Sequence, residues 1–262
     1  MKRDQRVGHT DSTGRGFRAQ HGPRGRGGPD AQPPRLREPT HPGAVRHAVA
    51  PLVRLVEEEL LPALRIESVS ASDPVVVRHA PAPWRVLGRG NYAAVLVHPA
   101  HPEVVVKVYA PGRPGVEAER EVYRRLGRHP AYSECLHAGD GWLALRRLHG
   151  VTLYDCLHRG LPIPEQVIRD IDQALEYARR RGLHPHDVHG RNVMMHEGRG
   201  LVVDVSDFLR DEDCGKWRDL KKAYFRVYRP VFMRLRLRVP YWTLDLVRLG
   251  YRLFRKVSPD RS

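Results

Sequence analysis

HDVHGRNVMM at residues 186–195, followed by VVD at residues 202–204, decides the fold of this 262-residue chain. Apolar pairs flank the polar positions in both segments. This pattern predicts two short buried strands joined by a turn, with Asp187, Asn192 and Asp204 near the strand ends. The alternative is a surface loop whose acids fall at this spacing by chance.

Lysine is rare in this chain, and Lys107 is the only one between Lys2 and Lys216. It stands within VVVKVY at residues 104–109, a β-branched run that predicts a buried strand. A buried cation is costly unless an anion pairs with it. Where arginine is the usual cation, a lone lysine favours a site that needs a compact point charge. The alternative is a strand residue whose ammonium group extends to solvent.

A glycine-rich turn precedes this strand, because LGRGNYAAV at residues 87–95 reads as G-x-G-x-x-A-x-V between two expected strands. Glycines let the backbone close over phosphate groups, and their amides supply hydrogen-bond donors. Gly88 and Gly90 are therefore candidate phosphate contacts. The third glycine of the usual pattern is missing, so the interpretation depends on the lysine strand and the acidic helix that follow.

An acidic helix is expected after the lysine strand, over about residues 117–126. Glu117 and Glu121 lie four residues apart on one face of it, and either could reach Lys107. Glu121 is the favoured partner, because the apolar residues around it supply a buried face. The alternative is a charged face in contact with solvent.

The ordered segments from about Trp84 to Asp204 resemble the protein kinase-like fold, in a compact bacterial, RIO-like or atypical form. The resemblance covers nearly half of the chain and keeps the order glycine-rich loop, strand lysine, helix glutamate, hinge, catalytic loop and metal-binding aspartate. It implies an α+β, two-lobed fold with a truncated, mostly helical C-lobe. The N-lobe would cover about residues 66–145 and the C-lobe about residues 149–262.

The same resemblance implies a role for each matching residue. Asp187 would be the catalytic base, and Asn192 and Asp204 would bind Mg²⁺. Lys107 would contact the α- and β-phosphates of ATP, with Glu121 as its ion-pair partner. The nucleotide-binding residues implied, including one in the hinge, are Gly88, Gly90, Val95, Lys107 and Leu148.

Departures from the family pattern concern regulation and the acceptor. Pro185-His186 precedes Asp187 where His-Arg is usual, so the arginine that senses activation-loop phosphorylation has no counterpart. Val205-Ser206 follows Asp204 in place of Phe-Gly, and no Ala-Pro-Glu motif follows. His189 replaces a lysine common in protein kinases, and a histidine there is familiar in aminoglycoside and sugar phosphotransferases. These departures imply an enzyme not switched through its activation loop and leave the acceptor open.

The histidines near the catalytic loop form a second candidate cluster. His184, His186 and His189 include an H-x-H spacing that can chelate a transition metal. No cysteine or further acid at ligand spacing completes such a site. We therefore expect one histidine to orient Asp187 and another to lie near the acceptor.

Other elements follow from hydrophobic periodicity and from proline and glycine positions. The elements expected are a helix through residues 52–64, a strand at residues 74–78, a helix at residues 164–181, and closing helices from Trp217 broken at Pro230 and Pro240. A basic amphipathic stretch at residues 244–256 would either lie on anionic lipid or cap the C-lobe, and the second is favoured.

The cysteines and the apolar segments of the sequence indicate the cellular compartment of the protein. The three cysteines form no CxxC pair, which indicates a reducing compartment without a disulfide framework. No apolar stretch approaches the ~20 residues that span a bilayer. The N-terminus lacks the apolar segment of a secretory signal. Together these observations predict a cytoplasmic protein.

The first 43 residues are rich in Gly, Pro and Arg and contain few large apolar side chains. We expect them to be disordered, because they cannot offset the entropy cost of ordering. Their Arg-Gly segments resemble tracts that bind RNA, although a solubilising tail is favoured. The formal net charge of +15 favours weak contacts with nucleic acid or another anionic surface. Residues 44–262 would form the folded domain.

Four functions are compatible with these patterns. The favoured one is an atypical serine/threonine protein kinase that uses ATP and Mg²⁺ to phosphorylate a protein substrate. The others are a kinase of a sugar or aminoglycoside-like molecule, a non-catalytic kinase-like binding module and an RNA-associated protein. ATP turnover separates the first two from the others, and the product that carries the phosphate separates the first from the second.

Overall fold

The computed structural model describes residues 49–70, 73–212, 214–235, 238–243, 246 and 250. The chain divides into two units, residues 1–39 and 40–262, and every described residue belongs to the second unit. The predicted basic tail at residues 1–43 and nearly all of the stretch at 244–256 lie outside the described residues.

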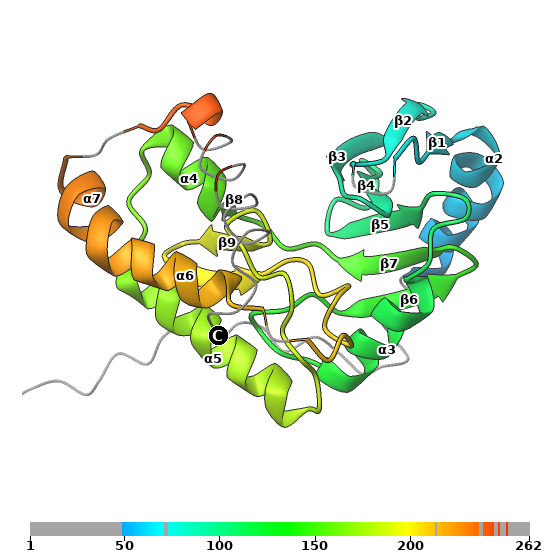
Figure 1. The fold of residues 1–262 in the computed structure, drawn as a ribbon. Helices are drawn as coiled ribbons and strands as arrows, with labels where there is room; N and C mark the ends of the chain where they lie inside the picture. The colour runs from blue at the N-terminus through cyan, green and yellow to red at the C-terminus, as the bar shows by residue number, and fades with distance from the viewer. Residues whose placement is uncertain are drawn as a thin grey trace, which may run out of the picture. The chain divides into compact units, whose positions relative to one another are not determined.

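A five-stranded antiparallel sheet with the order β3-β4-β5-β7-β6 forms the first half of this unit (Figure 1). Its central strands are apolar and β-branched, which suits strands covered on both faces. The lysine strand is β5, in the middle of the sheet. The strands are β3 (Arg85–Arg89), β4 (Ala93–Val97), β5 (Val104–Tyr109), β6 (Cys135–Gly139) and β7 (Trp142–Arg146).

A helix packs on this sheet and begins within the described residues at residue 49. Residues 49–54 are helical, the wider π-type segment η1 (Leu55–Leu60) continues them, and α2 (Leu61–Ala63) ends the helix. Its side chains at positions 52, 56 and 60 are buried in the same core as Val106 and Trp142 of the sheet. The expected helix near residues 52–64 is therefore present. It leads into a small hairpin, β1 (Arg65–Glu67) and β2 (Val76–His79).

Helix α3 (Val116–Leu126) is fixed at its C-terminal end to the helical half of the unit. The Tyr177 hydroxyl donates to the Leu126 carbonyl at 2.6 Å. A few residues further on, the fully buried Tyr132 donates its hydroxyl to the Ala174 carbonyl at 2.7 Å. Tyr177 and Ala174 both belong to helix α5 (Glu165–Arg180), so this helix holds the end of α3.

The second half is built around α5 (Glu165–Arg180), which packs on a three-stranded sheet of order β10-β9-β8 (Figure 1). The apolar side of α5 is buried, as its periodicity predicts. Its half-buried partner β10 is held by Asp170, which accepts from Arg199 and from the Gly200 amide. The remaining elements are β8 (Val151–Thr152), α4 (Leu153–Arg159), β9 (Val193–His196), β10 (Arg199–Val202), α6 (Lys216–Ala223), η2 (Tyr224–Phe232) and α7 (Met233–Leu235).

The helix break expected at Pro230 is wrong, because Pro230 lies inside η2, which runs from Tyr224 to Phe232. Proline has no amide hydrogen, and its ring clashes with the carbonyl four residues earlier in an α-helix. In the wider π-type helix the hydrogen bonds span five residues, which relieves this conflict. The chain therefore continues as one helix from α6 through η2 into α7.

No helix in the described part of the chain is both long enough and apolar enough to cross a membrane.

Gly200 is the position where the packing of α5 on β10 leaves least room. A Cβ atom there would lie 2.4 Å from the Val167 carbonyl oxygen and 2.9 Å from an Ile171 side-chain carbon. We expect Gly200→Ala to lower the free energy of unfolding by about 1–3 kcal/mol, as overpacking does. Urea denaturation measures this loss. The control is Gly88→Ala, whose added Cβ meets nothing within 4 Å, and an equal loss in both would contradict the packing argument.

Candidate active site

Lys107 forms a buried ion pair with Glu119 of α3. Its Nζ lies 2.7 Å from Glu119 Oε2 and 2.9 Å from Oε1, and the two side chains are 13% and 1% exposed. Tyr109 on the same strand donates its hydroxyl to Glu119 as well. The ion pair therefore joins the central strand of the sheet to α3.

The Lys107 ammonium also lies 3.4 Å from Asp204 Oδ1, across a separation of 97 residues in sequence. Asp204 follows the last strand of the predicted hairpin, so this contact joins the five-stranded sheet to the second half of the unit. One lysine is thus placed between two carboxylates, one buried and one partly exposed.

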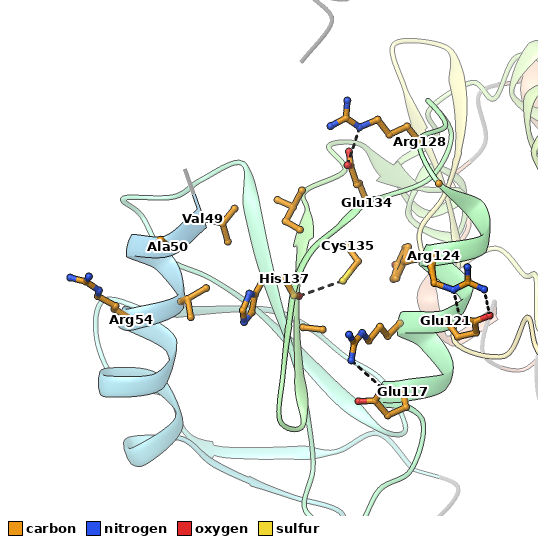
Figure 2. Close-up of a pocket in the computed structure, with 16 residues that line it drawn as sticks. Val49, Ala50, Arg54, Glu117, Glu121, Arg124, Arg128, Glu134, Cys135 and His137 are labelled. Carbon is orange, nitrogen blue, oxygen red and sulfur yellow. Dashed lines mark hydrogen bonds and ion pairs between the residues drawn. The ribbon is translucent and has the colours of Figure 1, made fainter. Parts of the chain in front are cut away.

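The predicted ion pair between Lys107 and Glu121 is wrong. Glu121 instead accepts from Arg124 at 2.5 Å and from Arg125 at 2.8 Å on the outer side of α3. Figure 2 shows Glu121 and Arg124 on α3, at the edge of a groove of about 1050 Å³ between α3, β6 and residues 49–54. Lys107 and Asp204 do not line this groove, so it is separate from the ion-pair site.

The geometry of α3 explains the error. A residue lies on the same helix face as those three, four and seven positions away. Glu119 therefore shares its face with Val122, Tyr123 and Leu126, and all four are buried. An acid on the apolar stripe of a helix is the one that turns inward, and this pattern in the sequence could have identified Glu119.

Burial and charge act against each other in this cluster. Burial lowers the pKa of Lys107, but Asp204 and Glu119 more than offset it, so the lysine pKa lies above its ordinary value. Burial raises the pKa of Glu119, and Lys107 counteracts only part of that rise. The partial loss of contact with water raises the pKa of Asp204. Lys107 and the hydrogen bond from the Ser206 amide outweigh this effect, so the net shift of the pKa is downward. Lys107 and Asp204 are therefore charged at neutral pH.

Gly88, Val95 and Lys107 lie in one row across neighbouring strands. Gly88 pairs with Val95 in the β3–β4 register, and Val95 pairs with Lys107 in the β4–β5 register. Directly opposed residues share a face of the sheet. A Cβ at Gly88 would meet no atom within 4 Å, and one at Gly90 only the Ala93 carbonyl at 3.7 Å. The packing of the protein itself therefore does not require glycine at these two positions.

The predicted hairpin consists of β9 and β10, and it brings Asn192 next to the strand end that carries Asp204. Val193 pairs with Val202, and the Val203 amide donates to the Asn192 carbonyl at 3.0 Å. The Asn192 side-chain amide donates to the Asp187 carbonyl at 3.0 Å. Its side-chain oxygen is left as the group that can bind a cation.

Asp187 has a left-handed backbone with φ of 54°. Few residues other than glycine adopt this region, and a strained backbone often occurs at functional sites. Its carboxylate contacts the Lys216 ammonium through Oδ1, and His189 Nε2 lies 3.6 Å from Oδ2. Burial raises the pKa of Asp187, but His189 and Lys216 outweigh it and lower the pKa to about 2. The carboxylate is therefore ionised at neutral pH.

The three histidines contact different groups. His184 Nδ1 lies 3.4 Å from Asp211, His186 Nδ1 lies 3.2 Å from the Glu212 carbonyl, and His189 lies beside Asp187. The part of the chain that the structure describes contains no group of three His, Cys, Asp or Glu residues that could bind a metal. One histidine thus contacts Asp187, as expected.

A Mg²⁺ ion fits the arrangement of Asp204 and Asn192, because magnesium is usually held by one or two carboxylates together with substrate phosphates. Asp204 and Asn192 offer oxygen ligands at the end of the β9–β10 hairpin. Burial raises the pKa of the neighbouring Asp207, and Asp204 and Asp187 raise it further against the lowering effect of Arg210. The smaller part of this rise that comes from Asp204 and Asp187 shows that their negative charges act at the same place, which favours a cation there.

The predicted hinge is the connection between β7 and β8. β7 ends at Arg146 and β8 begins at Val151, so Leu148 lies in the segment that links the large sheet to the small one. The Arg147 amide donates to the Glu103 carbonyl at 2.8 Å, which ties the start of this segment to the large sheet.

The sequence is similar to that of a known protein. It is 30% identical over 168 residues to a protein of Bacillus subtilis (strain 168) named "Putative serine/threonine-protein kinase YrzF", covering 63% of this chain and 76% of the relative. The chain belongs to the protein kinase-like superfamily. The resemblance inferred from the sequence is thus confirmed at the level of the superfamily, and no family model matches the chain.

The predicted α+β, kinase-like fold is confirmed as well, since the described residues form a five-stranded antiparallel sheet followed by a mainly helical half. Among solved structures, the chain is similar to "Crystal structure of Rad53 1-466 in complex with AMP-PNP", at a TM-score of 0.40 and 20% identity. The match covers 46% of this chain and 36% of the Rad53 chain. The kinase-like chain thus spans about a third of that structure.

The ion pair assignment can be tested through stability. Glu119→Ala leaves Lys107 without its main partner, and we expect the free energy of unfolding at pH 7 to fall by about 3 kcal/mol. The matched control is Glu121→Ala, two residues away on the same helix, which loses only exposed contacts with arginines. Urea denaturation of both variants measures the difference. A comparable loss in the two would refute the assignment of Glu119.

Proposed function

We propose that residues 44–262 form an ATP- and Mg²⁺-dependent phosphotransferase that phosphorylates serine or threonine hydroxyls of a protein. One observation carries the proposal: Lys107, paired with Glu119, lies 3.4 Å from Asp204, and Asp187 and Asn192 flank the same hairpin. Membership in the protein kinase-like superfamily supports it.

The row of Gly88, Val95 and Lys107 is the proposed nucleotide surface. Open space at Gly88 and Gly90 lets phosphate groups approach the backbone, since no Cβ intervenes. The Lys107 ammonium supplies a fixed positive charge for the phosphates, and Glu119 holds it in place. Leu148, in the segment between the two sheets, would contact the adenine.

Asn192 and Asp204 are the proposed ligands of Mg²⁺, which when bound neutralises charge on the phosphates of ATP. The side-chain oxygen of Asn192 is kept in position by the hydrogen bond from its amide nitrogen to Asp187. Asp204 is ionised at neutral pH because Lys107 and the Ser206 amide stabilise its charge.

Asp187 is the proposed general base. Its carboxylate is ionised at neutral pH, so it can accept the proton of the acceptor hydroxyl as the oxygen bonds to phosphorus. The strained backbone at Asp187 and the hydrogen bond from Asn192 to its carbonyl fix the direction of this side chain.

A small molecule is the second candidate acceptor. Only 11 residues (205–215) separate Asp204 from α6, which starts at Lys216, and this leaves little chain to hold a peptide. His189 also lies beside Asp187, as the sequence pattern of small-molecule phosphotransferases suggests. The relative from Bacillus subtilis, named as a serine/threonine-protein kinase, favours a protein acceptor.

The chemistry can be tested with two substitutions. Asp204→Ala should abolish phosphoryl transfer, and Asp187→Asn should lower turnover by ~10²–10⁴-fold, the usual contribution of a general base. Asp187→Asn should leave nucleotide affinity nearly unchanged, because the residue contacts the acceptor. Transfer from γ-labelled ATP measures turnover, and isothermal calorimetry measures affinity. The exposed Asp140 supplies the control Asp140→Asn, and wild-type turnover in Asp187→Asn would exclude this residue as the base.

The acceptor can be identified in the same assay. The wild-type protein is incubated with γ-labelled ATP and Mg²⁺, first alone and then with a protein extract or with a mixture of sugars and aminoglycosides. Label on serine or threonine of protein supports the main proposal. Label found only on small molecules supports the second candidate, and no transfer to any acceptor refutes both.

A further inference from the structure

Lys216 contacts the carboxylate that we propose as the base, although it lies 29 residues away in sequence. It is the first residue of α6, and its ammonium hydrogen-bonds Asp187 Oδ1. The side chains of Lys216 and Asp187 are 35% and 30% exposed. The pair is therefore open to substrate, unlike the sealed pair of Lys107 and Glu119.

Lys216 is not needed to attach α6 to the protein. The buried Trp217 donates its indole N–H to Asp172 of α5 at 2.7 Å, and Lys221 contacts the same carboxylate at 2.8 Å. These two residues fix α6 against α5. The helix thereby presents Lys216 at Asp187 from a rigid support.

The presence of lysine at position 216, in a chain that mostly uses arginine, is also informative. Lys107 and Lys216 are the only lysines between positions 3 and 220 of an arginine-rich chain. Each contacts one of the two candidate catalytic carboxylates, Asp204 and Asp187. An ammonium is a compact charge on a flexible stem, which suits a group that exchanges one anionic partner for another.

Both oxygens of Asp187 have cationic or polar neighbours, Lys216 on Oδ1 and His189 near Oδ2. An acceptor hydroxyl that approaches Oδ1 meets the Lys216 ammonium there and either shares the oxygen with it or displaces it. The phosphorus under attack must lie next to that hydroxyl, so an ammonium displaced from Asp187 has an anionic oxygen within reach.

We propose that Lys216 is a catalytic residue whose ammonium group moves from Asp187 to the phosphoryl group during its transfer. This inference rests on the proposed function. The acceptor oxygen bonds to the γ-phosphorus and gives its proton to Asp187. The bond from that phosphorus to the bridging oxygen breaks, and ADP leaves with the electron pair. Lys216 neutralises charge on the phosphoryl oxygens as the group is transferred.

The test compares Lys216→Met and Lys216→Arg with a control on the same helix, Lys222→Met. Lys222 is exposed and contacts only Asp219, at 3.7 Å, among the ion pairs of the described residues. Steady-state transfer from γ-labelled ATP gives kcat and KM for each variant. Binding of ADP with and without aluminium fluoride, which mimics the phosphoryl group in transfer, gives a readout independent of turnover.

We expect Lys216→Met to lower kcat by ~10²-fold or more, the typical effect of removing one group that stabilises transition-state charge. KM for ATP and the affinity for ADP alone should change by less than about threefold, because Lys216 acts only during transfer. Affinity for ADP with aluminium fluoride should fall with kcat. Lys216→Arg should recover part of the loss, and Lys222→Met should match the wild type.

Several outcomes would overturn the inference. A kcat for Lys216→Met close to or above the wild-type value, with Asp187→Asn inactive, would make Lys216 a dispensable or inhibitory contact and leave the proposed function standing. A wild-type protein without transfer would overturn both. If Lys216→Met is unstable in thermal melting, Lys216→Gln keeps a donor to Asp187 without the charge, and full activity of that variant would equally refute the inference.

Discussion

The contact of one ammonium with two carboxylates determines much of this structure. Lys107 lies in the central strand of the sheet, where an unpaired charge would be too costly to keep. Glu119 satisfies that charge from α3, and Asp204 approaches it from the β9–β10 hairpin. The sheet, the helix and the hairpin must therefore occupy compatible positions for Lys107 to remain charged.

The two lysine–carboxylate contacts differ in a way that matters for chemistry. The side chains of Lys107 and Glu119 are buried, so this ion pair is a fixed part of the protein. The pair of Lys216 and Asp187 is open, and α6 is fastened by other residues. A buried ion pair holds its charge in one place, whereas a partly exposed ion pair can exchange one partner for a ligand.

The sequence predicted those features that depend on local pattern. Apolar pairs around Asp187 and Asp204 indicated the hairpin, the β-branched run around Lys107 indicated a buried strand, and periodicity indicated α5 close to its observed bounds. It did not predict that Glu119 pairs with Lys107 or that Lys216 contacts Asp187. Glu119 could have been chosen over Glu121 from the apolar face of α3, on which it lies. The position of Lys216 depends on how α6 docks on α5, which is set by tertiary packing between segments far apart in the chain.

The attachment of α3 at both ends has a mechanical consequence. Tyr177 and Tyr132 fasten the C-terminal end of the helix to α5, whereas Glu119 lies in its first turn. Since Lys107 and Tyr109 hold Glu119 at the other end of α3, the helix acts as a strut that fixes the spacing between the five-stranded sheet and α5.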